Sequence, residues 1–318
     1  MTVSKDSSAP LVAVVGATGT QGGSVVLALS ESNKPYRIRA FTRDVSKPKA
    51  KALADKGVEV VSVSITADNK DAVFKAFQGA DYVFLVTNWA EHGDPSRETV
   101  EGKLMIDAAK AAGVKGIVWS GLPSIEAISG GKYKRVGHFE SKARVSEYGR
   151  AAGVPFVDVQ AGGYASNVRT FSRPIKTSDD TWTVSLPQSA STKTPIIDCD
   201  KDYGLFVRKA LEAPVFPDKQ TWTSFGDLIS NEDQVKQLAE VTGKKIVYQE
   251  ITPEAYGAGL ASFGTPPHIV TAIQEVFTSI SEFGYFAKDA IASQDGLARK
   301  PSTWKEYVQA NDWSEILA

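Results

Sequence analysis

Three glycines near the start of the chain, Gly16, Gly19 and Gly22, have the spacing of a loop that binds a nucleotide diphosphate. They follow an apolar run at 11–15 and precede a run at 24–30 whose composition predicts a helix. In such a loop the first glycine allows a tight bend, the second lets the backbone approach the diphosphate, and the third lets helix and strand pack closely. The free N–H groups and positive dipole end of the helix then face the anion. An ordinary tight turn is the alternative, but the position between strand and helix favours the binding loop.

A second feature lies where folds of this kind recognise the adenosine ribose, about twenty residues further on. An NAD-binding chain places an acid there, whereas here the strand pattern at 36–41 is followed by Thr42, Arg43 and Asp44. The guanidinium of Arg43 matches a 2′-phosphate in charge and geometry, and a hydrogen bond to a charged partner contributes about 1.5–3 kcal/mol. At about 1.4 kcal/mol for each factor of ten, this contact favours NADP over NAD by roughly ten- to a hundredfold. The sequence therefore predicts NADP(H), and Asp44 leaves NAD open as the alternative.

The composition argues against several classes of site and partner. A net charge of −1 and an isoelectric point near 6.4 provide no basic surface for direct binding of nucleic acid. The single cysteine, Cys199, excludes an internal disulfide and a thiolate zinc cluster, and three scattered histidines argue against a metal site. No apolar run approaches the length of a membrane span, and the first ten residues are expected to form a loose polar tail without the apolar core of a signal peptide. We expect a metal-free cytoplasmic protein, and access to the nucleus stays open.

Strand and helix patterns alternate through the first half of the chain, which predicts an α/β fold with a doubly wound parallel sheet of the Rossmann type. The expected strands lie at 11–15, 36–41, 58–63, 82–86, 117–119 and 156–160. The expected helices between them lie at 24–30, 46–56, 68–77, 95–112 and 138–152.

Beyond residue 162 the sequence becomes rich in turns, which predicts a smaller C-terminal α/β lobe over 163–318. Strands are expected at 182–186 and 245–250, and amphipathic helices at 231–242 and 266–283. A strand after Pro195 and a helix at 202–213 are expected to rejoin the first domain. The prediction is an NADP-binding domain at 1–162, completed by about 192–213 and interleaved with the lobe.

Several short motifs, taken together, carry a resemblance to a known family. They are Gly16-Ala17-Thr18-Gly19-Thr20-Gln21-Gly22-Gly23-Ser24-Val25, Thr42-Arg43, Val86-Thr87-Asn88-Trp89, Trp119-Ser120-Gly121-Leu122, His138-Phe139-Glu140-Ser141-Lys142 and Gly163-Tyr164-Ala165-Ser166-Asn167. The chain resembles the NmrA-like family, a branch of the atypical short-chain dehydrogenases/reductases, and is most similar in pattern to its NADPH-sensing members. The resemblance extends to Trp304 and so covers nearly the whole chain.

The resemblance implies a set of contacts with NADP(H). The diphosphate would meet Gly16, Ala17, Thr18, Gly19, Thr20 and Gln21; the adenosine phosphate Thr42 and Arg43; the adenine Ser64 and Ile65; the ribose and diphosphate Thr87, Asn88 and Trp89; and the nicotinamide Lys142, Tyr164, Ala165, Ser166 and Asn167. Two positions depart from the family pattern: Ser64 and Ile65 stand where relatives tend to carry an acid, and Val100 where some carry a lysine.

The catalytic chemistry follows less directly from the resemblance. Many members of the superfamily reduce carbonyls with a Tyr-x-x-x-Lys pair, but none of the ten tyrosines here precedes a lysine at that spacing. Lys142 remains, one helical turn after His138 and on the same helix face. Related isoflavone-reductase-like enzymes use a lysine at this place as proton donor; the alternative is that Lys142 only positions the cofactor. His138 and Ser120 are further candidates, with a helix start and a turn cap as their alternatives.

Two functions therefore stay open. One is an NADPH-dependent oxidoreductase or biosynthetic enzyme that uses Lys142 on an unknown small molecule, in a pocket between Trp89, Ser120, Tyr164 and the C-terminal lobe. The other is a non-catalytic NADPH/NADP redox sensor that regulates a protein partner such as a transcription factor, because a ligand can bias only an equilibrium whose states it distinguishes. A homodimer is compatible with either.

Overall fold

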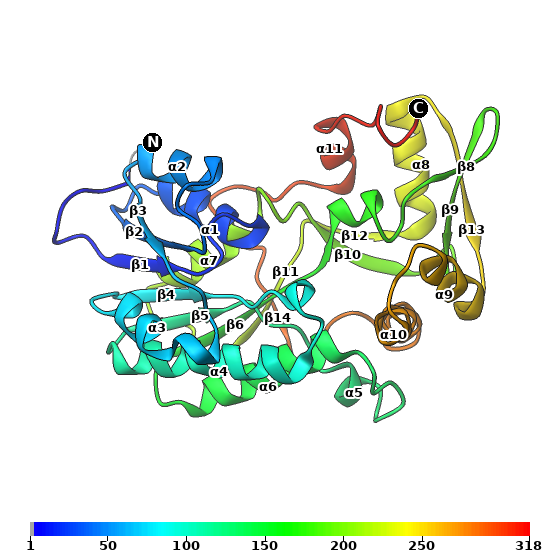
Figure 1. Cartoon of the computed structure of the whole chain (residues 1–318). Helices are drawn as coiled ribbons and strands as arrows, with labels where there is room; N and C mark the ends of the chain where they lie inside the picture. Colours follow the sequence, from blue (N-terminus) through cyan, green and yellow to red (C-terminus); the bar gives the residue numbers. More distant parts are fainter. Residues whose placement is uncertain (1–2) are drawn as a thin grey trace.

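A computed structural model describes residues 3–318 and contains a large parallel sheet flanked by helices (Figure 1). The strands of this sheet are β1 (Leu11–Val14), β2 (Arg37–Thr42), β3 (Glu59–Ser62), β4 (Tyr82–Leu85), β5 (Gly116–Trp119), β6 (Phe156–Ala161), β11 (Thr221–Ser224) and β14 (Ile291–Ala292). Their order is β14-β11-β6-β5-β4-β1-β2-β3, and every neighbouring pair is parallel. This confirms the Rossmann-type α/β fold and the six strands expected in the first half of the chain.

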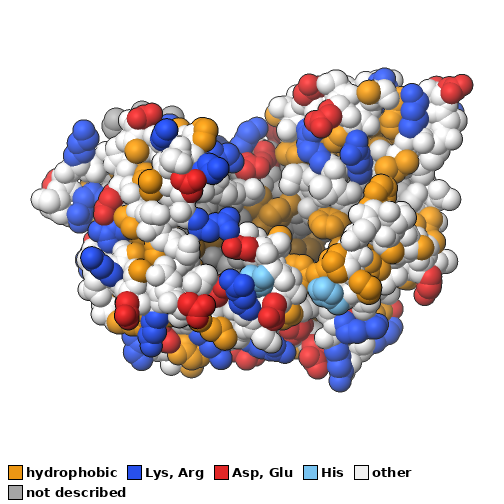
Figure 2. Space-filling view, viewed as in Figure 1, with side chains coloured by type: hydrophobic (Ala, Val, Ile, Leu, Met, Phe, Trp, Pro, Cys, Tyr) orange, Lys and Arg blue, Asp and Glu red, His pale blue; other side chains and the backbone are white. Residues whose placement is uncertain are grey.

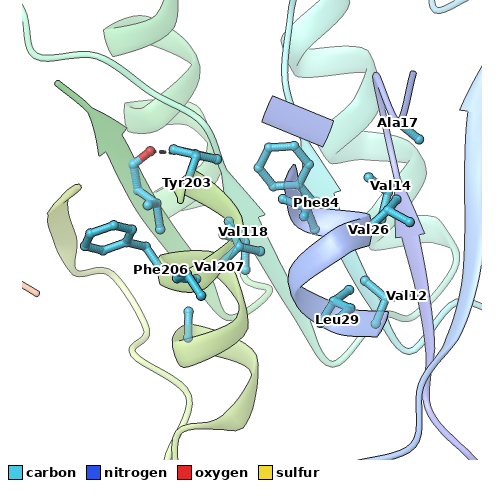
Figure 3. Close-up of a cluster of buried hydrophobic side chains, with 14 of the residues drawn as sticks. Val12, Val14, Ala17, Val26, Leu29, Phe84, Val118, Tyr203, Phe206 and Val207 are labelled. Atoms are coloured by element: carbon cyan, nitrogen blue, oxygen red, sulfur yellow. Dashed lines mark hydrogen bonds between the residues drawn. The ribbon is translucent and has the colours of Figure 1, made fainter. Parts of the chain in front are cut away.

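Helices cover both faces of the sheet, as a buried parallel sheet requires. One face carries α1 (Thr20–Ser30), α2 (Pro48–Asp55) and α7 (Tyr203–Glu212), and the other carries α3 (Lys70–Phe77), α4 (Pro95–Ala111) and α6 (Gly137–Ala151). Strand β1 serves both layers because successive side chains alternate: Val12 and Val14 pack with α1 and α7 (Figure 3), while Ala13 and Val15 pack on the opposite face.

Helix α7 meets α1 at a very close approach. A Cβ atom on Gly204 would lie 2.0 Å from the backbone oxygen of Ser24, and the Gly204 N–H donates to Ser24 Oγ at 2.9 Å. The Tyr203 hydroxyl, at the start of α7, donates to the Val159 carbonyl of β6 (Figure 3). The segment after residue 200 is therefore fixed to the large sheet.

The rest of the chain forms a second part with two small sheets. One has the order β12-β10-β7 and the other β13-β9-β8. The strands are β7 (Gly163–Tyr164), β8 (Ile175–Ser178), β9 (Thr181–Leu186), β10 (Lys193–Ile197), β12 (Asp227–Ser230) and β13 (Lys245–Glu250), and the helices are α8 (Asn231–Thr242), α9 (Pro253–Ser262), α10 (Pro267–Phe283) and α11 (Trp304–Gln309). A short helix, α5 (Ile125–Ile128), lies beside α10. Since β11 and β14 pair in the large sheet, the chain crosses between the two parts repeatedly.

The N-terminal tail differs from the expectation. Val3 is buried in the core beside the large sheet, and the Ser4 N–H donates to the Tyr36 carbonyl at 2.8 Å. The described part of the tail is thus anchored, because one apolar side chain has a core site and the backbone has a partner; Met1 and Thr2 lie outside the described residues. Within residues 3–318 we find neither a helix that could span a bilayer nor a group of three His, Cys, Asp or Glu residues placed to hold a metal.

Candidate active site

The carboxyl ends of the parallel strands lie along one edge of the large sheet, and the strand order changes direction between β1 and β4. Open α/β sheets bind ligands in the crevice at such a switch point. The turn after β1 starts at Gly16, whose φ of 67° is in the left-handed region. It closes with a hydrogen bond of 2.9 Å from the Gly19 N–H to the Gly16 carbonyl, and α1 begins at the next residue.

The glycine turn fits an anion at the start of α1. No side chain of the described residues caps this helix start, so the backbone N–H groups of its first turn are left for a ligand. A Cβ atom on Gly22 would lie 2.3 Å from the Gly16 carbonyl oxygen, so helix and turn pack too closely for any side chain there. Gly19 is exposed. A Cβ atom built on it would lie 3.3 Å from the Gly16 carbonyl oxygen and would have no other neighbour within 4 Å among the described residues.

The residues expected to contact the adenosine end of the cofactor lie at or just after the carboxyl ends of β2 and β3. Arg43 is exposed, and its guanidinium makes an ion pair of 2.7 Å with Glu91, which follows β4. Thr42 Oγ1 lies 3.3 Å from the backbone nitrogen of Asp44 and stabilises the turn there. The Ser64 carbonyl accepts a hydrogen bond from the Asn69 side chain, and Ile65 packs against the core.

A cavity of about 480 Å³ begins at the same sheet edge and continues between the large sheet and the second part. Figure 2 shows a hollow between the two parts of the molecule, with apolar side chains on its walls. Many residues singled out from the sequence line the cavity: Gln21, Thr87, Asn88, Trp89, Ser120, His138, Lys142, Tyr164, Ala165 and Asn167. The opposite wall comes from β9, β10, α8 and α10. Gly16, Ala17, Thr18, Gly19, Thr20 and Ser166 lie outside its lining.

Lys142 is held by a buried carboxylate that the sequence did not reveal. Its ammonium lies 2.9 Å from Glu98 Oε1 and donates to Thr87 Oγ1 at 2.6 Å and to the Thr87 carbonyl at 3.1 Å. The Glu98 side chain is 0% exposed, and the hydroxyl groups of Thr87 and Ser141 also donate to it. All three ammonium protons of Lys142 thus point to acceptors within this network.

The network keeps Glu98 ionised. Burial works to raise the pKa of the Glu98 carboxyl, but the charge of Lys142 and the hydrogen bonds from Ser141 and Thr87 outweigh it and hold the pKa below its ordinary value. The charges of Glu98 and Lys142 cancel, so the network brings no net charge to the cavity wall.

His138 lies against Trp89, with ring centroids 5.1 Å apart. Burial lowers the pKa of His138 to about 4, so the imidazole is neutral near pH 7 and does not act as a cationic acid there. Among the described residues, neither His138 Nδ1 nor Trp89 Nε1 has a hydrogen-bond partner. Two buried polar atoms at the cavity wall are therefore left for a ligand.

Ser120 and Tyr164 complete the inner wall. Ser120 Oγ donates to Gln21 Oε1 at 2.9 Å, which connects the end of β5 to the first turn of α1. Burial, with the neighbouring Cys199 and Tyr203, raises the pKa of the Tyr164 hydroxyl well above its usual value, so it stays protonated. Among the described residues, no lysine makes a hydrogen bond with either hydroxyl, as expected without a Tyr-x-x-x-Lys pair.

Sequence reasoning missed Glu98, and although it placed the C-terminal lobe on one side of the pocket, it did not identify α10 as part of that wall. Glu98 stands in the first turn of α4, where an acid is common for reasons of helix polarity alone, and no spacing links it to Lys142 on α6. An amphipathic helix was predicted where α10 lies, but the position of α10 beside the site depends on how the second part of the chain packs.

Residues 8–308 match the model of the NmrA-like family. The chain belongs to the NmrA-like family. Among its relatives, an NmrA-like family domain-containing oxidoreductase of Malbranchea aurantiaca is 30% identical over 76% of each chain, and one of Penicillium ochrochloron is 28% identical over 94% of this chain and 92% of that protein.

Several solved structures of this fold are complexes with nicotinamide cofactors. NmrA, a negative transcriptional regulator in complex with NADP, has a TM-score of 0.74 at 20% identity and covers 95% of this chain and 94% of its own. The NADPH-dependent quinone oxidoreductase QOR2 of Escherichia coli, complexed with NADPH, has a TM-score of 0.75 at 21% identity and covers 94% of this chain and 99% of its own.

Proposed function

We propose that this NmrA-like protein is an NADPH-dependent oxidoreductase that reduces a small molecule in the cavity between its two parts. One observation carries the proposal: the cavity extends from the sheet edge that would hold the cofactor into a mostly apolar chamber, and Lys142 lies on its wall. A site that only reports the state of its cofactor needs no such chamber. The oxidoreductases among its relatives support the same function.

The chain's own residues divide the work of holding the cofactor. The glycine turn and the start of α1 would bind the diphosphate, and Arg43 the 2′-phosphate, once Glu91 releases it. Trp89, Lys142 and the segment 164–167 would surround the nicotinamide. When bound, NADPH supplies a hydride.

The second requirement of a carbonyl or imine reduction is a proton. Lys142 is the charged side chain on the cavity wall, and its protons are shared with Thr87 and Glu98. For the lysine to act as the acid, one proton must turn from Thr87 toward the substrate; loss of that proton to the substrate oxygen or nitrogen completes the reduction. Glu98 holds the ammonium in place while this happens.

The test is NADPH consumption with a panel of ketones, enones, imines and quinones. We expect turnover with the native chain and a loss of about a hundredfold or more in Lys142→Met, as is typical for removal of a general acid. Because Lys142→Met leaves Glu98 buried without its partner, the double variant Lys142→Met/Glu98→Gln restores neutrality and provides a folded comparison.

The control is Lys103→Met, which removes a lysine on the neighbouring helix whose ammonium lies over the Tyr148 ring, away from the cavity. Equal turnover in Lys142→Met and Lys103→Met would remove Lys142 as the acid. Tight NADPH binding without turnover of any compound would contradict the proposal that the protein is an oxidoreductase and would favour a redox sensor.

A further inference from the structure

The cavity walls are nearly free of charge. Of the described residues that line it, Lys142 is the only lysine, arginine, aspartate or glutamate, and its charge is already matched by Glu98. His138, the only histidine among the described lining residues, is neutral near pH 7. A ligand with a net charge would therefore meet no free opposite charge in the chamber.

The chamber beyond Lys142 is apolar over most of its surface. Its walls include Val184 and Leu186 of β9, Val235 and Leu238 of α8, and a face of α10 with members such as Ile273. A carboxylate or phosphate placed against these side chains would lose its hydration without a replacement partner, which is costly. The whole cavity, including the end that would hold the nicotinamide, has a volume of about 480 Å³, within the range of about 300–1,000 Å³ usual for small-molecule sites.

Two buried amide side chains interrupt the apolar wall on the side formed by the second part. Gln188 and Asn231 are 3% and 4% exposed, and both line the cavity. Gln188 Nε2 donates to the Phe277 carbonyl at 2.9 Å, and Asn231 Nδ2 lies near three acceptors: the Ser189 carbonyl at 3.1 Å, and Gln188 Oε1 and the Tyr248 hydroxyl, each at 3.3 Å.

These partners show which atom of each amide is the nitrogen. They do not use every hydrogen-bonding group of the two side chains. Among the described residues no group donates to Asn231 Oδ1, and Gln188 Nε2 has a second N–H without an acceptor. The pair can therefore offer one acceptor and one donor to a neutral polar group, and buried polar groups generally find such partners.

We propose that the chamber binds a neutral, largely apolar molecule whose reducible bond lies at the Lys142 end and whose neutral amide or hydroxyl group meets Gln188 and Asn231. The position of the reducible bond rests on the proposed function; the neutral charge and the amide contact rest on the walls alone. Gln188 and Asn231 then determine specificity, because a substrate without a polar group leaves Asn231 Oδ1 and the second N–H of Gln188 without a partner.

Three ketones that differ in a single substituent test this proposal: benzophenone, para-benzoylbenzamide and para-benzoylbenzoate. Calorimetry first establishes that tetrahydro-NADP binds, an analogue whose nicotinamide ring is uncharged and transfers no hydride, and each ketone is then titrated into the protein saturated with this analogue. We expect the amide to bind more tightly than benzophenone, and the carboxylate, which has nearly the same size as the amide, to bind at least about tenfold more weakly than the amide.

Variants on one helix assign the effect. Asn231→Leu should abolish the advantage of the amide over benzophenone, whereas Lys236→Ala, an exposed change on the same helix, should preserve it. Gln234→Lys places a cation at a half-buried lining position of similar length, and it should bring the carboxylate closer to the amide in affinity even if Asn231→Leu does not fold.

The proposal is overturned if the carboxylate binds as tightly as the amide to the native protein, if Asn231→Leu folds and retains the preference for the amide, or if none of the three ketones binds. Failure of the proposed function looks different: the amide binds with the expected preference, but no compound is reduced. Since these titrations measure binding without turnover, the two failures are separable.

Discussion

Arg43 and Glu91 belong to strand ends on opposite sides of β1, yet their side chains form an ion pair of 2.7 Å. Arg43 follows β2 and Glu91 follows β4, so the pair crosses the sheet edge at which the glycine turn begins. A 2′-phosphate that binds Arg43 would therefore compete with the carboxylate of Glu91 and be repelled by its charge, whereas NAD(H) carries no such group.

We expect Glu91→Gln to tighten NADPH binding while leaving NADH binding unchanged. Both side chains are exposed, and exposed pairs contribute about 0.2–1 kcal/mol, so the gain should be at most about fivefold. Calorimetry at low and high salt measures it, and the gain should shrink as salt screens the pair. A similar gain for NADH would show that Glu91 acts on something other than the 2′-phosphate.

Arg43→Ala should weaken NADPH binding by about ten- to a hundredfold and bring it close to the affinity for NADH. The reason is the loss of the charged hydrogen bonds to the 2′-phosphate. Lys47→Ala is the matched control, because Lys47 is a nearby exposed cation that lies 3.8 Å from Asp44. If Lys47→Ala has the larger effect, the phosphate site lies one turn further along the chain.

The half of the chain with regular βα units could be predicted closely from sequence. A run such as 11–15 is continuously apolar and ends at glycines, so its burial, its strand conformation and the turn that follows are all local consequences. The helix at Lys70–Phe77 likewise follows from its periodicity, and in the second part the helix at Asn231–Thr242 follows from its periodicity and its caps, Ser230 and Gly243.

The remaining features depend on contacts between distant segments. Strand β14 is two residues long and exists because Ile291 pairs with Trp222, some seventy residues earlier in the chain. The Glu98–Lys142 pair joins two helices, and the Arg43–Glu91 pair joins two strand ends. No local pattern in the sequence encodes these pairings. The glycine turn could therefore be predicted, whereas the pairing of Arg43 with Glu91 and of Lys142 with Glu98 could not.

The Glu98–Lys142 pair should produce a specific pH dependence of stability. The folded-state pKa of Glu98 lies below its unfolded value near 4.5, so its stabilisation is present above about pH 4.5 and is lost as the pH falls through the folded-state pKa. Lys142→Met removes the lysine that lowers this pKa and leaves an unpaired buried carboxylate, at a cost of about 3–5 kcal/mol near neutral pH.

Chemical denaturation between about pH 7 and pH 4 measures the effect. Because protonation relieves the buried charge in Lys142→Met, the difference in unfolding free energy between native chain and variant should narrow toward acid. The double variant Lys142→Met/Glu98→Gln should lack this dependence. A constant difference between native chain and Lys142→Met at every pH would contradict the buried ion pair.

A change in the protonation of His138 should not affect the activity in the neutral pH range. Its pKa of about 4 lies below the unfolded value near 6.5, so the folded protein keeps a neutral imidazole and loses stability as the pH falls from about 6.5 toward 4. His138→Gln should leave the shape of the pH–rate profile between about pH 5 and 8 unchanged. Proton NMR of the imidazole checks the pKa directly, and a midpoint near 6.5 would refute the neutral assignment.

The two later glycines of the turn should separate folding from cofactor binding. In Gly22→Ala the new Cβ would lie 2.3 Å from the Gly16 carbonyl oxygen, a backbone atom that cannot move without shifting the turn, so we expect a loss of about 1–3 kcal/mol in stability. In Gly19→Ala the Cβ would lie 3.3 Å from the same oxygen, at an exposed residue with negative φ, so stability should change little.

Although Gly19→Ala should leave stability almost unchanged, it should weaken NADPH binding, because the added methyl group would stand where the diphosphate approaches the backbone. Thermal melts and calorimetry on the same samples measure both quantities, and we expect Gly19→Ala to retain its melting temperature while its NADPH affinity falls by about tenfold or more. Gly23→Ala is the control, since its Cβ would lie at an ordinary 3.5 Å from the Ala17 carbonyl oxygen. If Gly19→Ala binds NADPH like the native chain, the diphosphate does not lie on this turn, and the cofactor assignment of the whole sheet edge fails with it.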